Sequence, residues 1–277
     1  MTGKALVPIV KRAEGGWETV LLQQHFVLET EAEVAAIENA IGSRGYYPFR
    51  TDPAEMEAFA SDHAKIDALF REMVIATMGR WMEIADSRLS QRGIDCLVCP
   101  GNDDTFAIDA VIAGSKTVKN VEGKIVELGR GFEMASTGWS NPTPWKTCRE
   151  ESEDSLANRI AAILGDREDF SHFIFSFHAP PRATGLDDAP ELDRNLNVLN
   201  AGQTLVPVGS EAVRSAIEKC GPLLSLHGHI HESKGVARIG KTLCVNPGSL
   251  YEQGVLQGAL IDLDPGRGIR SYVLTTG

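Results

Sequence analysis

The sequence predicts an α/β fold, and three observations support this prediction. From residue 94 onward, short apolar runs with strand character alternate with segments whose apolar residues recur at helical spacing. Three of these runs end directly in clusters of polar residues, as parallel strands do at one edge of a sheet. The composition, 43% hydrophobic and 23% charged, is ordinary for a globular protein. We therefore expect a single domain over 1–277, built from strands covered by helices.

The first ninety or so residues are expected to be mainly helical. Residues 19–27 form an apolar run that predicts a strand. The Thr-x-x-Glu sequence at 30–33 matches a capping box, which predicts the start of a helix. Asp52 and Pro53 supply an N-cap and a first-turn proline for a further, long helical region. These signals predict a helical insertion over about 30–92 within the domain.

The later elements follow the alternating pattern. Each predicted helix starts at a serine N-cap and stops at a glycine, which are usual boundary residues. Apolar runs near the C-terminus predict additional strands, which could form a second sheet. In chain order, we expect strands at 94–99, 173–177, 223–226, 241–245, 259–263 and 269–274, and helices at 152–164 and 210–220.

The polar clusters that follow the first three of these strands carry the candidate chemistry. They are residues 100–104, His178 and residues 227–232, and the last cluster holds three of the seven histidines in the chain. If the three strands end at one edge of a sheet, these side chains converge. Imidazole together with amide or carboxylate oxygen is a ligand set suited to a first-row divalent ion.

Each cluster also has an ordinary structural interpretation. A single histidine at a strand end, such as His178, is commonly a hydrogen-bonded core residue, and Asn102 beside Gly101 could form an Asx turn. The segment 228–231 (Gly-His-Ile-His) is harder to explain in this way. Burying two alternating histidines after an apolar strand costs free energy of hydration, unless a metal or polar groups interact with them. Taken together, the three clusters favour a functional site.

These motifs resemble the calcineurin-like metallophosphoesterase family, whose signature contains Gly-Asn-His-Asp/Glu, a later isolated histidine and Gly-His-x-His. The resemblance covers most of the chain, from residue 101 to residue 248. It implies that Asn102, His178 and His229 are ligands of one metal ion and that His231 is a ligand of a neighbouring ion. It also implies a four-layer α/β/β/α sandwich of two mixed sheets.

The resemblance further implies that the protein is an enzyme that hydrolyses a phosphate mono- or diester by means of a metal-activated hydroxide. An intact family member holds two divalent ions, which could be Mn, Fe, Zn, Co or Ni. The expected partner is a small phosphoester substrate. Nucleic acid is expected only as a phosphodiester substrate, because a net charge of −11 and the lack of a Lys/Arg cluster argue against general backbone binding.

The sequence departs from the family pattern at two places. The Asp-x-His and Gly-Asp motifs, which supply further metal ligands in the family, are absent, and the start Met1–Lys4 resembles the stretch just after Gly-Asp. We therefore expect the fold to lack its first strand, as if an upstream segment were missing. Asp103 stands where the catalytic histidine of the family follows the asparagine, and Asp104 aligns with the acid after it. Both aspartates are candidate catalytic residues.

Two other functions stay open. The incomplete motif set also fits a non-catalytic scaffold on the same fold that binds protein partners. A different metallohydrolase, such as a zinc-dependent amidase, is disfavoured because neither His-x-x-Glu-His nor His-Glu-x-x-His occurs. We expect a cytoplasmic protein, because no apolar stretch approaches the roughly 20 residues that cross a bilayer and the N-terminus lacks the pattern of a secretory signal. The oligomeric state is not predicted.

Overall fold

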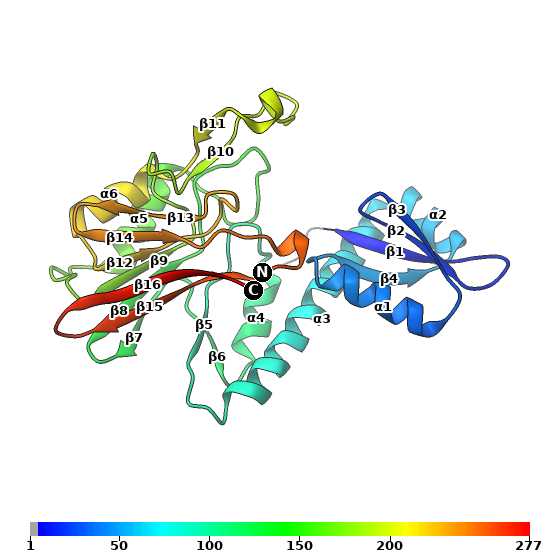
Figure 1. Cartoon of the computed structure of the whole chain (residues 1–277), viewed down its shortest axis with the longest axis horizontal. Coiled ribbons are helices and arrows are strands. Elements are labelled where there is room, and N and C mark those ends of the chain that lie inside the picture. The colour runs from blue at the N-terminus through cyan, green and yellow to red at the C-terminus, as the bar shows by residue number, and fades with distance from the viewer. Residues whose placement is uncertain (1–4) are drawn as a thin grey trace.

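The computed structural model describes residues 5–277 and shows a mixed α/β protein with several sheets (Figure 1). The prediction of an α/β fold is therefore confirmed. Met1–Lys4, where the sequence resembles the stretch after a Gly-Asp motif, lies outside the described residues. Instead of the two mixed sheets that were predicted, residues 5–277 form one six-stranded sheet, one four-stranded sheet and three two-stranded sheets.

The six-stranded sheet forms the centre of the larger part of the molecule. Its four inner strands are parallel, and each of its two edge strands is antiparallel to its neighbour. Parallel inner strands are covered on both faces and are therefore apolar over most of their length, which is why the run at 173–177 was recognisable. In spatial order the strands are β13 (Gly235–Ile239), β14 (Thr242–Asn246), β12 (Leu224–Leu226), β9 (Phe173–Phe177), β8 (Phe132–Thr137) and β7 (Lys124–Gly129).

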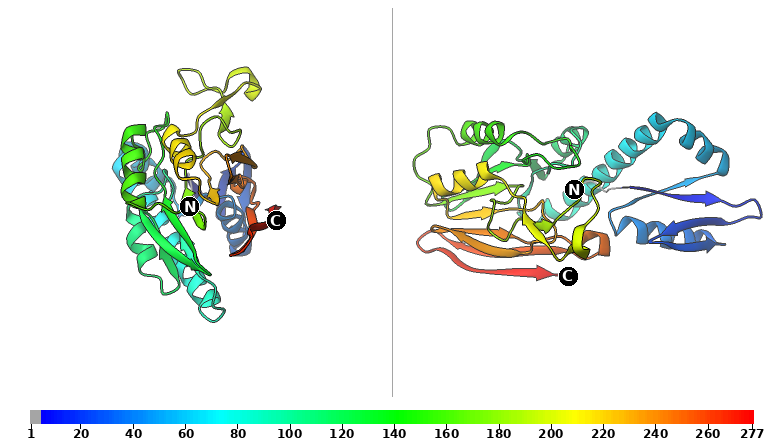
Figure 2. Two further views of the ribbon diagram at one scale, coloured as in Figure 1. Left: turned by 90° about the vertical axis from the view of Figure 1, so that its left-hand side faces the viewer. Right: turned by 90° about the horizontal axis from the view of Figure 1, so that it is seen from above.

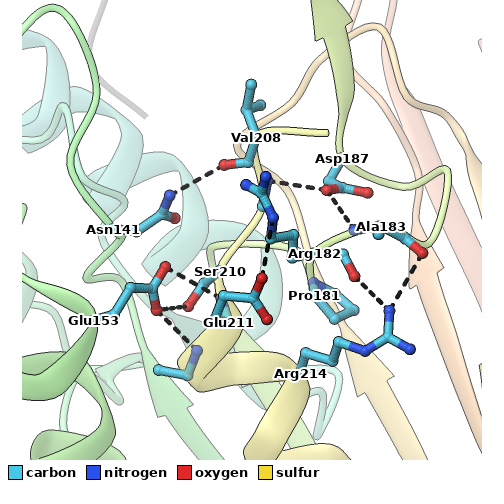
Figure 3. A network of polar contacts seen from close by, with 12 residues as sticks. Asn141, Glu153, Pro181, Arg182, Ala183, Asp187, Val208, Ser210, Glu211 and Arg214 are labelled. Atoms are coloured by element: carbon cyan, nitrogen blue, oxygen red, sulfur yellow. Dashed lines mark hydrogen bonds and ion pairs between the residues drawn. The ribbon is translucent and has the colours of Figure 1, made fainter. Parts of the chain in front are cut away.

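Helices α5 (Glu153–Leu164) and α6 (Glu211–Cys220) cover one face of this sheet (Figure 2). They begin at the predicted serine caps, Ser152 and Ser210. The Glu153 carboxylate also accepts hydrogen bonds from the Ser210 hydroxyl, over 2.7 Å, and from two backbone amides in the first turn of α6 (Figure 3). An acid at the start of one helix therefore caps the next helix and joins the two.

Two pairs of strands pack on the opposite face of the six-stranded sheet. One is the antiparallel hairpin of β15 (Gln257–Asp264) and β16 (Gly268–Thr276), and the other is the parallel pair of β5 (Cys96–Val98) and β6 (Val118–Asn120). The predicted second sheet was therefore only partly right. Among the described residues, these two pairs are not hydrogen-bonded to each other, so they remain separate ladders.

The long helical region predicted after Pro53 consists of two helices. Helix α2 (Pro53–Ser61) begins at the predicted Asp52 N-cap, and α3 (His63–Leu89) follows after a break at Asp62. The Asp62 side chain caps α3 by accepting a hydrogen bond from a first-turn amide. Helix α3 then packs, together with α4 (Ala107–Ala113), on the β5–β6 pair.

A four-stranded sheet with one helix on it forms the N-terminal part of the chain, which lies apart from the six-stranded sheet (Figure 1). Its strand order is β3-β2-β1-β4, and β1 and β4 are parallel neighbours. The helix begins with the capping box predicted at 30–33. The elements are β1 (Leu6–Lys11), β2 (Trp17–Leu21), β3 (Gln24–Leu28), α1 (Glu31–Gly42) and β4 (Tyr47–Thr51).

Two predictions for this region were wrong. The single strand at 19–27 is instead part of the β2–β3 hairpin, which turns at Leu22 and Gln23 with φ of +50° and +65°. These residues do not give the Asn-Gly or Asp-Gly signal that such turns favour. The predicted helical insertion over about 30–92 is interrupted by β4. Its proline, Pro48, argues against a strand in the sequence, but β4 is an edge strand, where proline is tolerated.

The remaining elements are short. Strands β10 (Asp188–Pro190) and β11 (Leu205–Pro207) form an antiparallel pair that carries the 3-10 turn η1 (Leu199–Gly202) and projects from the larger part (Figure 1). A second 3-10 turn, η2 (Tyr251–Gln253), precedes β15. Within residues 5–277, no helix is both long and apolar enough to span a membrane.

Candidate metal centre

The loops that follow several strands meet at one edge of the six-stranded sheet. Strands β8, β9, β12 and β14 are parallel, so their carboxyl ends lie at the same edge. The loop after β5 reaches this edge as well, because its Asn102 contacts His178 after β9 and His229 after β12. The structure thus brings together one residue from each of the three polar clusters.

Asn102, His178 and His229 are in direct contact. The Asn102 Oδ1 lies 2.9 Å from His178 Nε2 and 3.0 Å from His229 Nδ1. The two imidazole rings meet edge to face, with 5.2 Å between their centroids. Asn102 itself is only 6% exposed. One amide oxygen and two ring nitrogens therefore face one another at a largely buried position.

The backbone holds His229 in a strained conformation. Its φ is +64°, in the left-handed region that favours glycine. The Ile230 N–H donates a hydrogen bond of 2.7 Å to the Gly228 carbonyl, which closes a three-residue turn around His229. A three-residue turn with a positive central φ is the rare and strained kind of γ-turn. Strain of this kind persists where the surrounding structure enforces it, and it clusters at functional sites.

Asn246 at the end of β14 supports this turn. It is fully buried, and its Nδ2 donates to the carbonyls of Ile230, over 2.8 Å, and Leu186, over 3.1 Å. Its Oδ1 accepts the N–H of Gly248 over 2.9 Å. The sequence pattern did not single out this role. An asparagine that bonds backbone groups of distant loops leaves no local spacing signal.

Burial makes the histidines of this region weak bases. The pKa of His178 lies well below its usual range because of burial and the neighbouring His229. The pKa of His229 is lowered to about 4, by burial first and then by His231. Burial also lowers the pKa of His227 to about 4, although its Nδ1 donates to the Phe177 carbonyl over 2.9 Å. All three imidazoles are therefore neutral at pH 7, and neutral imidazole is the form that binds metals.

His231 lies beside this contact and packs against another loop. Its ring meets the ring of Tyr251 in η2 edge to face, with 5.5 Å between centroids. It interacts electrostatically with both His178 and His229, whose pKa values it helps to lower. The fourth predicted ligand thus lies near His178 and His229, and its imidazole has an aromatic partner.

The two candidate catalytic aspartates have different surroundings. Asp103 is exposed. Asp104 is 1% exposed, and its Oδ2 accepts the N–H of Gly101 over 2.8 Å. The Asp104 carbonyl accepts the Nε–H of the buried Arg149 over 3.2 Å. Asp104 therefore closes the turn that carries Asn102, whereas Asp103 extends toward solvent.

Sequence reasoning missed Thr147 and Glu150, which lie in the loop after β8 (residues 140–151). The Asn102 Nδ2 donates to Thr147 Oγ1 over 2.7 Å, and the Thr147 hydroxyl donates to the Glu150 carboxylate. The backbone N–H of Arg149 donates to the Asn102 carbonyl over 2.9 Å. The loop therefore holds Asn102 by its side chain and by its backbone. No motif marks these residues, because their partner is more than forty positions away.

Two glycines permit the close approach of these loops. A Cβ on Gly101 would lie 2.8 Å from His178 Nε2, so a side chain there would collide with the imidazole. A Cβ on Gly138, just after β8, would lie 1.4 Å from the carbonyl oxygen of Pro100. The loops after β5 and β8 can therefore touch only because residue 138 has no side chain.

The donor set is smaller than the two-metal centre that the family resemblance implies. Within residues 5–277, no group of three or more His, Cys, Asp or Glu side chains is arranged to hold a metal ion. The contact described above consists of two histidines and one amide oxygen.

Comparison with known proteins gives few matches. No protein-family model matches the chain. An uncharacterized protein of Methanocaldococcus jannaschii, MJ1162, is 30% identical over 156 residues, which are 56% of this chain and 64% of that protein's length. The chain thus matches less than two thirds of this relative.

Two solved structures are similar to the chain. The crystal structure of TT1561 from Thermus thermophilus is 22% identical, with a TM-score of 0.44, over 72% of this chain and 79% of that one. A second crystal structure is 13% identical, with a TM-score of 0.48, over 98% of this chain and 97% of that one. At TM-scores below 0.5, neither structure identifies a function for this chain.

Proposed function

We propose that the chain is a metal-dependent phosphoesterase that hydrolyses a small phosphate mono- or diester. The observation that carries the proposal is the contact of Asn102 with His178 and His229. These three residues stand at the motif positions that resemble metal ligands of the calcineurin-like metallophosphoesterases. They also meet at the carboxyl ends of parallel strands, where α/β proteins bind ligands.

We extend the proposal to the architecture of the whole chain, as one metallophosphoesterase-like domain. In this interpretation, helices α5 and α6 are the first layer and the six-stranded sheet is the second. The strand pairs β5–β6 and β15–β16 are the third layer, and helices α3 and α4 are the fourth. The packing contacts between successive layers support this order.

The residues present suit a divalent cation. One amide oxygen and two imidazole nitrogens are a donor set suited to a first-row divalent ion. The Asn102 oxygen lies at 2.9 and 3.0 Å from the two imidazole nitrogens. These nitrogens donate protons to the oxygen in the metal-free protein, so metal binding would require both rings to carry the proton on their other nitrogen. His231 would be a ligand of a neighbouring ion.

A bound divalent ion would polarise the phosphoryl group and lower the pKa of an attacking water. Asn102, His178 and His229 would hold the ion, and Asp104 would keep the Asn102 turn in place. Asp103, exposed next to Asn102, would be the side chain that faces the leaving group. Asp103 takes the place of the histidine that protonates the leaving group in the family pattern, so we expect esters whose leaving groups need no protonation to be favoured.

The test combines metal binding with turnover. Mn²⁺ binding is measured by isothermal titration calorimetry, and hydrolysis of bis-p-nitrophenyl phosphate is followed with and without Mn²⁺. We expect the wild type to bind Mn²⁺ and to turn over the ester only when Mn²⁺ is present. His229→Ala should lose both properties, whereas His25→Ala, at an exposed position on β3, should keep them. Unchanged Mn²⁺ affinity in His229→Ala would show that the ligand assignment is wrong.

A non-catalytic, protein-binding scaffold is the second candidate function. The small donor set among residues 5–277 favours it, because a two-metal clamp needs more ligands than Asn102 and three histidines supply. The same experiment separates the two candidates. A wild-type chain that shows no turnover of the ester at saturating Mn²⁺ would favour the scaffold over the phosphoesterase.

A further inference from the structure

Glu150 is linked to Asn102 through Thr147, and its carboxylate accepts four hydrogen bonds. Its carboxylate accepts the backbone N–H groups of Thr143, over 2.8 Å, and Thr147, over 2.9 Å. It also accepts the hydroxyls of the same two threonines. Burial alone would raise the pKa of Glu150, but these hydrogen bonds lower it. Glu150 is therefore an ionised group that can only accept.

This arrangement decides how the Asn102 amide is oriented. A hydroxyl carries one proton, and the Thr147 hydroxyl must direct its proton at the Glu150 carboxylate. Thr147 Oγ1 can therefore only accept from Asn102. The Asn102 group that lies 2.7 Å from it must be the NH2 group, and the carbonyl oxygen Oδ1 must face His178 and His229.

We propose that Thr147 and Glu150 are positioning residues that hold the Asn102 carbonyl oxygen toward the two histidines and so prepare it as a metal ligand. The metal role rests on the proposed function, but the amide orientation is a property of the metal-free protein as well. An asparagine amide has nearly the same shape after a half turn, yet the turned amide would present NH2 hydrogens where a cation needs an oxygen. Hydrogen-bond partners of metal ligands commonly serve to prevent such misorientation.

The loop that carries these two residues is itself well held. Ser140 and residues 149–151 exchange backbone hydrogen bonds of 3.0 and 3.1 Å. Between them, the chain turns at Lys146 with a φ of +52°. Arg149 then joins the loop to the Asn102 backbone. The main-chain bond from Arg149 to Asn102, two residues after Thr147, therefore helps to fix Thr147 relative to Asn102.

Three single variants separate positioning from general stability. Thr147→Val keeps the side-chain shape and removes the hydroxyl, and Thr147→Ser restores the hydroxyl. Thr143→Val is the matched control, because it removes a hydroxyl bound to the same carboxylate but not to Asn102. Each variant is examined by Mn²⁺ titration calorimetry. In addition, ¹⁵N NMR of the metal-free protein at pH 7 shows which ring nitrogen of each histidine carries the proton.

In the metal-free wild type, we expect the proton on Nε2 of His178 and on Nδ1 of His229, because both nitrogens donate to Oδ1. Thr147→Val should give mixed tautomers and weaken Mn²⁺ binding by about 10- to 100-fold. Thr147→Ser and Thr143→Val should stay close to the wild type. If Thr147→Val does not fold, Glu150→Gln is the second test. Its amide can donate to Thr147 Oγ1, which frees the threonine proton to point at Asn102, so the tautomers should change in the same way.

The outcomes distinguish this inference from the proposed function. Unchanged tautomers together with unchanged Mn²⁺ affinity in Thr147→Val would overturn the positioning role. A wild type that binds no Mn²⁺, but whose tautomers still change in Thr147→Val, would uphold the positioning of the amide and contradict the metal function. Opposite tautomers in the wild type would show that the NH2 group faces the histidines, and the inference would then be wrong.

Discussion

At the scale of single residues, His229 combines a chemical role with backbone strain. Its imidazole contacts Asn102, while its φ of +64° places a residue with a Cβ in a conformation that glycine adopts most easily. Asn246 and the Gly228–Ile230 hydrogen bond hold it there. In the conformation that these contacts hold, the His229 ring is directed at the Asn102 amide oxygen.

The strain at His229 predicts an unusual order of stability. His229→Ala and His229→Gly both remove the imidazole, but only alanine keeps the Cβ penalty of the left-handed region. We expect His229→Gly to be more stable than His229→Ala by about 1 kcal/mol in urea unfolding of the metal-free protein. At His25, an exposed position within strand β3, the order should reverse, because glycine weakens a strand. Equal or greater stability of His229→Ala would contradict the assignment of strain.

At the scale of elements, helix α3 is tied to the segment between α4 and β6 by one carboxylate. Asp86 accepts the Ser115 hydroxyl over 2.6 Å and the Thr117 N–H over 2.9 Å. These hydrogen bonds, led by that of Ser115, lower the pKa of Asp86 to about 2. The connection that leads into β6 is therefore fixed by a side chain of helix α3.

The hydrogen bonds of Asp86 predict that replacing this residue lowers the stability of the protein by an amount that depends on pH. The pKa falls from 3.8 to about 2 in the folded protein, so the folded state favours the ionised form. The stabilisation is complete well above pH 3.8 and is lost as the pH falls through 3.8 toward 2. Asp86→Asn should therefore lower the urea midpoint relative to the wild type at pH 7 and by a smaller amount, about half, at pH 3. Glu83→Gln, at an exposed position on the same helix, serves as the control. An Asp86→Asn effect that is as large at pH 3 as at pH 7 would rule out this explanation.

At the scale of the whole molecule, one aromatic side chain connects the N-terminal sheet region to the candidate site. Tyr251 in η2 packs edge to face on His231. The tyrosine ring also lies against Gly45, between α1 and β4, where a Cβ would come within 2.6 Å of it. The N-terminal sheet, which the figures show at one end of the molecule, thus reaches the histidine loop through Tyr251 (Figure 1, Figure 2).

This connection predicts an energetic coupling between distant segments. Gly45→Ala introduces both strain, at a φ of +72°, and a collision with Tyr251. Gly123→Ala, at a φ of +67° with no atom near the added Cβ, introduces strain alone. We expect Gly45→Ala to destabilise the protein more than Gly123→Ala does. When Gly45→Ala is combined with Tyr251→Ala, the additional destabilisation caused by the collision should disappear. A double-mutant cycle should then give a coupling free energy of about 0.5–3 kcal/mol. Additive effects would mean that the two segments do not pack together in solution.

Local signals in the sequence were enough to predict much of the fold. The caps at Thr30, Asp52, Ser152 and Ser210 lie where they were predicted, because a cap depends on residues within one turn. The apolar runs of three inner strands, β9, β12 and β14, were also recognisable, since burial on both faces leaves few polar residues, whereas the fourth inner strand, β8, was not predicted. The β2–β3 hairpin and strand β4 were missed, because Leu22-Gln23 lacks a turn signal and Pro48 argues against a strand.

The sequence by itself determined that three polar clusters follow apolar strands, and hence that Asn102, His178 and His229 could converge. Only the tertiary structure decided the details that give this convergence its chemistry. The hydrogen bond from Asn102 to Thr147 and the hydrogen bond from Asn246 to Ile230 join residues that are far apart in the chain. Such contacts depend on how separate loops pack at the sheet edge, and no spacing between neighbouring residues encodes them. The same holds for the strand pairs β5–β6 and β15–β16, which pack on one face of the six-stranded sheet. Among the described residues they remain two separate pairs, and this depends on how whole elements pack.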